Sequence, residues 1–207
     1  MEGLTNHIVI IGRQGCGKTT LAEALADVGF TRTILTTTRP PRDGEENGVD
    51  YWFVDDKEFD MLQYELVGVQ EYNTVHGLWR YGVDIREINA DGDTVTVLDP
   101  ATFLDIRDDI HDRFAIYMNI PKDVRMMRCL YRAGYDPDEV QRREEADEEQ
   151  FAWMDQHYQD FCDLAIRQVV SPEEDVQRIL RYLRAFNADA IDYDGAIDEG
   201  DISTEEE

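Results

Sequence analysis

The segment GRQGCGKT at residues 12–19 constrains the fold of this chain more than any other stretch. It matches the pattern G-x-x-x-x-G-K-[ST], in which glycines let backbone N–H groups turn inward around a phosphate while the lysine reaches the outer phosphates. The apolar run at residues 7–11 reads as a buried parallel strand, and residues 19–28 show an amphipathic helical pattern. An incidental Gly-rich turn would not need a buried strand before it and a helix after it. The order strand, loop, helix therefore predicts an α/β fold that binds a nucleoside triphosphate.

The loop assigns a set of residues to this triphosphate, which we expect to be ATP together with Mg²⁺. The positive end of the following helix favours the anion, and the Thr19 hydroxyl can bind the metal. Asp99 ends the strand-like run TVTVLD, where a second acidic residue of such folds approaches the magnesium. Asp99 can also be the N-cap of a helix that begins at Pro100, and the two roles are compatible. The expected ATP contacts are Gly12, Gly15, Cys16, Gly17, Lys18, Thr19 and Thr20, and the expected metal ligands are Thr19 and Asp99.

The rest of the chain alternates strand-like and helical stretches, which is typical of one α/β domain. Adjacent prolines and two Asx-Gly pairs exclude a regular helix from residues 36–51. We expect strands at residues 31–36, 51–54, 94–99, 114–120 and 163–170, short strands and turns at 66–83, and helices from 55, from 100, at 122–132, at 137–158 and at 171–186. Residues 187–207 contain no lysine or arginine and are expected to form a disordered acidic tail.

The chain is strongly acidic, with 46 Asp and Glu residues against 20 Lys and Arg residues and a formal net charge of −26. Only three of the basic residues are lysines, whereas arginine is kept where planar, bidentate anion contacts are useful. Self-repulsion of this size destabilises a compact state at low salt and is screened at molar salt. The pattern resembles proteins of extreme halophiles and their viruses; the alternative is an ordinary acidic protein with a disordered tail. The charge also argues against nucleic acid as a partner, because phosphate backbones are repelled.

The sequence indicates a protein that works inside a cell. It has no run of 18 apolar residues that could cross a membrane, and its N-terminus lacks the basic opening of a secretory signal. Cys16, Cys129 and Cys162 are odd in number and lack metal-ligand spacing, so we expect free thiols in a reducing compartment. We therefore expect a cytoplasmic monomer or homodimer, in the host cytoplasm if the chain is viral.

The Pro- and Gly-rich segment at residues 36–51 is the best candidate for a second phosphate site. Arg39 and Arg42 lie three residues apart in a rigid stretch that ends at Tyr51. Two fixed guanidinium groups and a phenol hydroxyl form a good receptor for a phosphate. A solvated basic loop is the alternative, but it does not explain why arginines cluster in so acidic a chain.

This segment, TTTRPPRDGEENGVDYWFV, resembles the signature S-x-T-T-R-x-P-R-x-G-E-x-x-G-x-D-Y-x-F of the guanylate kinase family, which holds the phosphate of GMP. The resemblance covers most of residues 7–186, and includes the phosphate loop, EYNTVHGLWRYG from Glu71, the VLD strand and the lid pattern at 128–143. It implies a P-loop three-layer α/β fold with a central parallel sheet, a small acceptor-binding subdomain and a helical lid. The implied domain spans 1–186, with a core of 1–35 and 91–186, an acceptor-binding segment of about 36–90 and a lid of about 125–145.

The resemblance also implies roles for individual residues. Glu71 would accept hydrogen bonds from the ring N–H and the amino group of the base. Arg39, Arg42, Tyr51 and Tyr81 would hold the phosphate of the monophosphate. In the lid, Arg128, Arg132 and Arg143 match arginines that close over the ATP phosphates and neutralise the transferring group, although each could instead form a surface ion pair. The implied catalytic residues are Lys18, Arg39, Arg128, Arg132 and Arg143.

Two positions depart from the family pattern on the side that reads the base. Leu35 replaces a serine, Val83 replaces a serine or threonine, and the segment before Tyr81 is one residue longer. Losing a buried hydrogen-bond partner can change discrimination by about 10²-fold. The residues expected to hold the phosphate thus match the family pattern, whereas residues expected to contact the base differ from it. The expected substrate contacts are Leu35, Arg39, Arg42, Tyr51, Glu71, Tyr81, Val83 and Asp99.

The implied activity is ATP-dependent phosphorylation of a nucleoside monophosphate to the diphosphate. GMP or dGMP is the first expectation because Glu71 persists. The alternatives are another or modified deoxynucleoside monophosphate, a guanylate-kinase-like binding module without catalysis, and a P-loop kinase for another phosphorylated small molecule such as a ribose phosphate.

Overall fold

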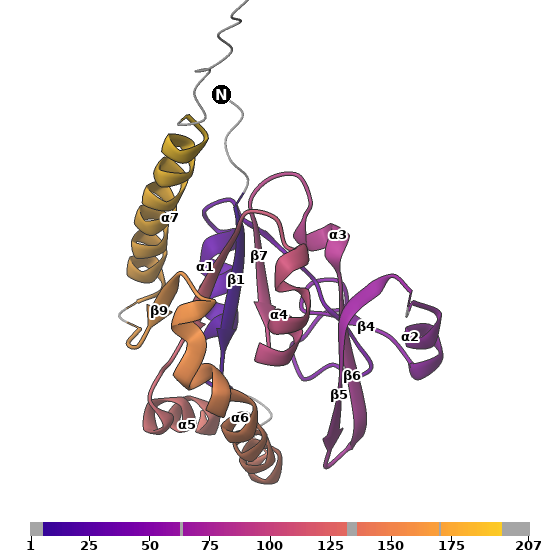
Figure 1. Cartoon of the computed structure of the whole chain (residues 1–207). Coiled ribbons are helices and arrows are strands. Elements are labelled where there is room, and N and C mark those ends of the chain that lie inside the picture. Colours follow the sequence, from indigo (N-terminus) through magenta and orange to yellow (C-terminus); the bar gives the residue numbers. More distant parts are fainter. Residues whose placement is uncertain (1–5, 63, 132–135, 170, 196–207) are drawn as a thin grey trace, which may run out of the picture.

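A computed structural model describes residues 6–62, 64–131, 136–169 and 171–195 of the chain (Figure 1). Its centre is a five-stranded sheet of order β2-β7-β1-β8-β9, in which every pairing is parallel. The strands are β1 (His7–Gly12), β2 (Thr31–Arg32), β7 (Thr94–Leu98), β8 (Arg113–Met118) and β9 (Leu164–Ile166). The predicted central parallel sheet is therefore confirmed.

Two apolar clusters cover the two faces of this sheet. Side chains alternate along β1, so Ile8 and Ile10 belong to one cluster while Val9 and Ile11 belong to the other. None of these four residues has exposed surface, which explains why the strand reads as an unbroken apolar run. The first cluster is completed by α1 (Lys18–Ala26) and α7 (Pro172–Gly195), and the second by α4 (Pro100–Ile106) and α6 (Pro137–His157). The predicted three layers are thus present.

The carboxyl ends of β1 and β7 meet at one edge of the sheet. Ile11 pairs with Leu98, so the loop that follows β1 and Asp99, which follows β7, lie next to each other. Parallel sheets of this kind bind ligands just outside the carboxyl ends of their strands. The fold therefore brings the phosphate loop and Asp99 to the place where a ligand is expected.

A second sheet, of order β4-β3-β6-β5, carries the acceptor segment (Figure 1). Its strands are β3 (Thr36–Thr37), β4 (Trp52–Phe53), β5 (Leu66–Thr74) and β6 (Gly77–Asp84). The single strand predicted at residues 31–36 is wrong, because the chain changes sheet within it. The N–H of Thr33 still donates to Val95 of β7, but the carbonyl of Leu35 already accepts from Trp52 of β4. The strand propensity of a residue is the same whichever sheet it joins, so nothing in the local sequence marks the change of sheet.

Strands β5 and β6 form a long hairpin where the sequence predicted short strands and turns. They pair from Leu66↔Asp84 to Thr74↔Gly77, which leaves Val75 and His76 as the turn. The register shifts between Val67 and Gln70, so β5 contains one residue more than β6 at that point. This β-bulge hides the strand period from a sequence pattern, because the alternation changes phase inside one strand.

The remaining helices are α2 (Asp56–Leu62), α3 (Ile85–Ile88) and α5 (Lys122–Leu130), with 3₁₀ turns at Arg107–Asp109 and Tyr158–Asp160. Of these helices, α2 and α5 begin where the sequence predicted, within one residue, whereas the short α3 was not predicted. Asp55 caps α2, because its carboxylate accepts from the N–H of Glu58 while the Glu58 carboxylate accepts from the N–H of Asp55. No helix among the described residues is both long and apolar enough to cross a membrane.

Helix α7 continues to Gly195, past residue 186 where the sequence predicted its end and the start of a disordered tail. Residues 187–194 contain neither proline nor glycine, so no helix breaker stops the helix before Gly195. The rest of the predicted tail, residues 196–207, lies outside the described residues.

Candidate active site

Two adjoining cavities form one cleft at the carboxyl edge of the central sheet. The larger has a volume of about 740 Å³ and contains the phosphate loop, and the smaller, of about 210 Å³, lies beside the β5–β6 hairpin. Both cavities are lined by Gly12, Lys18, Leu35, Tyr51, Val97, Arg143 and Asp147. The shared lining makes the cleft continuous from the phosphate loop to the hairpin.

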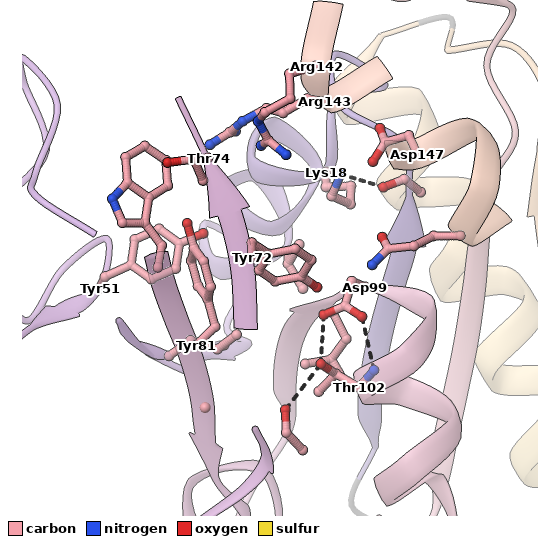
Figure 2. A pocket seen from close by; sticks show the side chains of 18 residues that line it. Lys18, Tyr51, Tyr72, Thr74, Tyr81, Asp99, Thr102, Arg142, Arg143 and Asp147 are labelled. Atoms are coloured by element: carbon pink, nitrogen blue, oxygen red, sulfur yellow. Dashed lines mark hydrogen bonds between the residues drawn. The ribbon is translucent and has the colours of Figure 1, made fainter. Parts of the chain in front are cut away.

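Lys18 lies where the two cavities join, with its ammonium group folded onto the loop (Figure 2). Its Nζ donates to the carbonyl oxygens of Gly12 at 2.5 Å and Arg13 at 2.9 Å. The loop itself needs glycine: Gly15 has a φ of +71°, and a Cβ there would lie 2.5 Å from the carbonyl oxygen of Arg125. A longer contact joins the Lys18 Nζ to the Cys16 sulfur at 3.9 Å. Since all three partners are uncharged, the ammonium can turn to a phosphate without breaking a buried ion pair.

The other expected ATP contacts divide into two groups. Gly12, Gly15, Gly17, Thr19 and Thr20 line the larger cavity, where the prediction requires them. Cys16 does not, because it has no exposed surface and its side chain packs in the core beneath the loop. The carbonyl oxygen of Cys16 accepts a hydrogen bond from the Arg128 guanidinium at 2.9 Å.

The edge of the sheet fits a magnesium ion that is held mainly by phosphates. Thr19 lines the larger cavity and Asp99 lines the smaller one. Among the described residues, no group of three His, Cys, Asp or Glu side chains could hold a metal alone. Mg²⁺ in kinase sites usually takes one or two protein ligands together with waters and substrate phosphates. Asp99 is also the predicted N-cap of α4, since Oδ1 accepts from the Thr102 N–H at 3.0 Å and Oδ2 from its hydroxyl at 2.6 Å.

The structure does not place Arg39 in the cleft. The residue is 2% exposed and its guanidinium pairs with both carboxylate oxygens of Glu45, at 2.8 and 3.1 Å. It also lies over the ring of Tyr51, 5.1 Å from the centroid. Burial alone would raise the pKa of Glu45, but the hydrogen bonds from Arg39 and from the Arg42 N–H, together with the charges of both arginines, outweigh it and the pKa is lowered. Arg39 thus supports the acceptor side from below, while Arg42 lines the larger cavity.

Tyr51 and Tyr81 form the aromatic wall between the two cavities and the second sheet. Their rings meet edge to face at a centroid distance of 6.0 Å, and Tyr81 meets Tyr72 in the same way at 5.6 Å. Burial, and then the neighbouring Tyr81, raise the pKa of Tyr51, so its hydroxyl is a neutral donor. Both predicted phosphate-binding tyrosines therefore lie on the cleft.

The base-reading residues are the part of the prediction that changes most. Glu71 is exposed and does not line either cavity, so the structure contradicts its expected position. Its neighbour Tyr72 lines the smaller cavity instead and projects toward Asp99 (Figure 2). Leu35 lines both cavities, whereas Val83 has no exposed surface and packs in the core. Val83 is therefore structural and cannot contact a base.

The lid places two neighbouring arginines of α6 over the cleft. Arg142 and Arg143 line the smaller cavity, and Arg143 also lies over the ring of Trp79 at 5.9 Å (Figure 2). Both guanidinium groups are held by Glu139, which accepts from Arg142 Nε at 2.9 Å and Arg143 Nε at 2.6 Å. Arg128 lines the larger cavity, and Arg132 lies outside the described residues.

Buried ion pairing fixes the lid helices against the phosphate loop. Arg125 of α5 and Glu144 of α6 are 3% and 2% exposed, and their two-point pair has distances of 2.7 and 2.8 Å. Asp147 of α6 accepts from the Gln14 N–H of the loop at 2.8 Å, and burial raises the pKa of this carboxyl group. The loop and the lid thus form one connected wall of the cleft.

Sequence reasoning missed several residues that line the smaller cavity, among them Tyr72, Thr102, Arg142, Asp147 and Gln150. A signal was present on α6: Arg143, Asp147 and Gln150 follow at spacings of four and three, which places them on one helix face. For Tyr72 no pattern of alternation would have sufficed, because the bulge in β5 decides which side chains face the cleft.

Comparison with known proteins places this geometry in one family. The family model described as guanylate kinase matches residues 4–185. A guanylate kinase of Neisseria meningitidis serogroup A is 33% identical over 67% of this chain and 70% of its own length. A guanylate kinase of Thermobifida fusca is 32% identical over 65% of this chain and 71% of its own length.

Solved structures show the same fold. The crystal structure of guanylate kinase from Anaplasma phagocytophilum aligns with a TM-score of 0.60 at 24% identity, over 90% of this chain and 88% of that one. At this identity the likeness concerns the fold, whereas the family model spans residues 4–185 and so includes both the phosphate loop and the second sheet. The chain therefore belongs to the guanylate kinase family of nucleoside monophosphate kinases.

Proposed function

We propose that this protein transfers the terminal phosphate of ATP to a nucleoside monophosphate, with GMP or dGMP as the leading acceptor. The observation that carries the proposal is the continuous cleft with a phosphate loop at one end and a guanidinium- and tyrosine-lined pocket at the other. Two anions can bind there with their phosphates facing each other across Lys18. Family membership supports the same activity, since the sequence relatives are guanylate kinases.

The part of the larger cavity around the phosphate loop is the proposed ATP site, whereas the part beside Arg42 and Tyr51 belongs to the acceptor. Backbone N–H groups of the loop and the start of α1 would hold the β-phosphate, while Lys18 would turn from its carbonyl partners to the transferring group. Mg²⁺ would neutralise phosphate charge, with the Thr19 hydroxyl as ligand and Asp99 acting directly or through water. Arg128, which already donates to the loop carbonyls, would contact the outer phosphates.

On the acceptor side, the described residues would align the attacking phosphate oxygen. Arg42 and the hydroxyls of Tyr51 and Tyr81 would hold the monophosphate, with Arg39 fixing the Tyr51 ring from below. Transfer would be in line and without a covalent intermediate. A general base is not needed, because the acceptor phosphate is already ionised near neutral pH. Arg142 and Arg143 would stabilise the charge of the transition state and exclude water from above.

The decisive experiment compares Lys18→Ala with the wild type in a coupled assay for ADP, using a panel of nucleoside monophosphates and a ribose phosphate. We expect Lys18→Ala to lower kcat/KM by at least about 10³-fold, because the chain loses the cation that moves to the transferring group. Lys57→Ala is the matched control, since Lys57 is an exposed lysine of α2 outside the cleft.

Circular dichroism and melting should show the same fold in both variants. Near-normal turnover by Lys18→Ala would refute the role of the loop. If the wild type releases no ADP with any acceptor, the chain is a binding module. Turnover with the ribose phosphate alone would show a sugar phosphate kinase instead.

A further inference from the structure

The β5–β6 hairpin presents an unexpected set of side chains to the acceptor. Six of its residues line the smaller cavity, the glycines Gly68 and Gly82 and four with larger side chains: Tyr72, Thr74, Trp79 and Tyr81. On the opposite face, Glu71 pairs across the hairpin with Arg80, whose guanidinium donates to Asp56 and Asp60 of α2. The glutamate that could accept from a purine base therefore faces away from the cleft.

The bulge at Gly68 causes this orientation. Val67 pairs with Val83, but the next pair along the strand is Gln70 with Tyr81, so three steps in β5 match two in β6. Because side chains alternate between the two faces of a strand, one extra residue in β5 reverses which of the later β5 side chains face the cleft. Without the bulge, odd-numbered β5 residues, Glu71 included, would share the face of Tyr81.

Packing against α4 makes the bulge a fixed feature. Gly68 has a φ of +57°, and a Cβ on it would lie 2.6 Å from Cγ2 of Thr102. The Thr102 hydroxyl lies 3.3 Å from the Gly68 carbonyl oxygen and 2.6 Å from Oδ2 of Asp99. The bulge is thus tied to the N-cap of α4, so the register of the hairpin and the position of Asp99 are set together.

Tyr72 occupies the position that the register gives it, beside Asp99 and Gln150. Burial raises the pKa of Tyr72 above its usual value, and the Asp99 carboxylate raises it further, so the phenol stays neutral. Both Tyr72 and Gln150 line the smaller cavity, and the Tyr72 side chain points toward Asp99 (Figure 2). A tyrosine hydroxyl has one donor and two acceptor positions, so a hydroxyl that turns its proton toward the Asp99 carboxylate leaves its oxygen free to accept from a ligand. The Gln150 amide carries two N–H donors.

We propose that Tyr72 and Gln150 are specificity-determining residues that read the 6-oxopurine edge of the acceptor base. A lone pair of the Tyr72 hydroxyl accepts from the ring N–H, and the Gln150 amide donates to the adjacent carbonyl oxygen. Asp99 already accepts from the Thr102 N–H and the Thr102 hydroxyl and faces Tyr72, so it adds little for the 2-amino group of guanine. The acceptor class is then 6-oxopurine nucleoside monophosphates, with hypoxanthine accepted nearly as well as guanine. This inference rests on the proposed kinase function.

Purine acceptors of equal size test the inference. We expect wild-type kcat/KM for IMP to lie within about tenfold of that for GMP, because only a weak contact to the amino group is lost. AMP should be at least about 100-fold poorer, since it offers an amino group and a bare ring nitrogen to groups set for the reverse pattern. A GMP preference over IMP of more than about 100-fold would overturn the proposal.

Substitutions at two neighbouring β5 positions identify the residue that contacts the acceptor base. Tyr72→Phe should lower kcat/KM for GMP and IMP by about ten- to a hundredfold, mainly through KM, while the rate with AMP changes less than twofold. Glu71→Gln, the matched control on the opposite face, should change none of these values by more than twofold. If Glu71→Gln lowers GMP use while Tyr72→Phe does not, the glutamate reads the base and the inference is wrong.

Equilibrium binding separates this inference from the proposed function. Titration calorimetry with GMP and IMP, in the absence of ATP, should show similar affinities that weaken in Tyr72→Phe but not in Glu71→Gln. If the wild type binds in this way and transfers no phosphate, the kinase proposal fails and the base-reading proposal stands. If the wild type turns over and Tyr72→Phe keeps the same GMP and IMP affinities, the base-reading proposal fails and the kinase proposal stands.

Discussion

At the scale of single residues, the acceptor side depends on an ion pair that solvent scarcely reaches. The Arg39 and Glu45 side chains are 2% and 13% exposed, and Glu45 also accepts from the backbone N–H of Arg42 at 2.8 Å. The carboxylate therefore ties together both arginines of the segment. Removing one partner of such a pair leaves an uncompensated charge in a poorly solvated place.

We expect Glu45→Gln to lower the free energy of unfolding by about 3–5 kcal/mol, because the Arg39 guanidinium loses its counter-charge. Urea denaturation at fixed high salt measures the change. Glu46→Gln, at the exposed position next in the chain, should change stability by less than about 0.5 kcal/mol. Equal stabilities of the two variants would show that the pair contributes no more than a surface contact.

The sequence predicted individual residues best where a motif fixes the backbone. Lys18 and Thr19 follow from the loop pattern, and Tyr51 and Tyr81 lie on the cleft as the resemblance implied. The partner of Arg39 was harder to predict, since a guanidinium that could hold a phosphate can equally pair with a carboxylate six residues away. That choice depends on how the loop folds over itself, which residue types do not encode locally.

At the scale of elements, helix α6 organises the roof of the cleft through one carboxylate. Glu139 lies in the first turn of the helix and holds both Arg142 and Arg143, three and four residues further on. Burial alone would raise the pKa of Glu139, but the hydrogen bonds from Arg142 and then Arg143 outweigh it and lower the pKa to about 2. The pair of arginines is thus already oriented before a nucleotide binds.

This pKa predicts an acid-dependent stability. A carboxyl group with a folded pKa of about 2 and an unfolded value of 4.5 stabilises the fold above pH 4.5, and this contribution is lost as the pH falls toward 2. We expect the stability difference between the wild type and Glu139→Gln to be constant above about pH 5 and to shrink between pH 4.5 and 2. Denaturation at several pH values and constant ionic strength measures it. A difference that does not vary with pH would contradict the ion-pair origin.

The sequence predicted a helix or strand well where burial or a capping residue gives it a regular pattern. The buried strands β1, β7 and β8 and the capped helices α2 and α4 were found near their observed bounds. The hairpin was not, because the bulge at Gly68 changes the phase of its pattern and its outer face is exposed. An isolated glycine inside a strand-like run was the available signal.

At the scale of the whole molecule, charge dominates the physical behaviour. A net charge of −26 repels itself in the compact state and is screened when the Debye length falls to about 3 Å near 1 M salt. We expect the melting temperature to rise by several degrees between low salt and about 2 M KCl, with most of the rise below about 1 M. Sucrose at equal osmolality is the control. A melting temperature that KCl leaves unchanged would remove the halophilic interpretation.

The contact of the lid with the hairpin gives this molecule a built-in optical reporter. Trp79 is 9% exposed beneath the Arg143 guanidinium, whereas Trp52 and Trp153 are already 43% and 45% exposed. Because Trp79 also lines the smaller cavity, a nucleotide bound there would touch this shielded indole and change its emission. Occupancy of the cleft can therefore be followed in real time by intrinsic fluorescence, without attaching a dye.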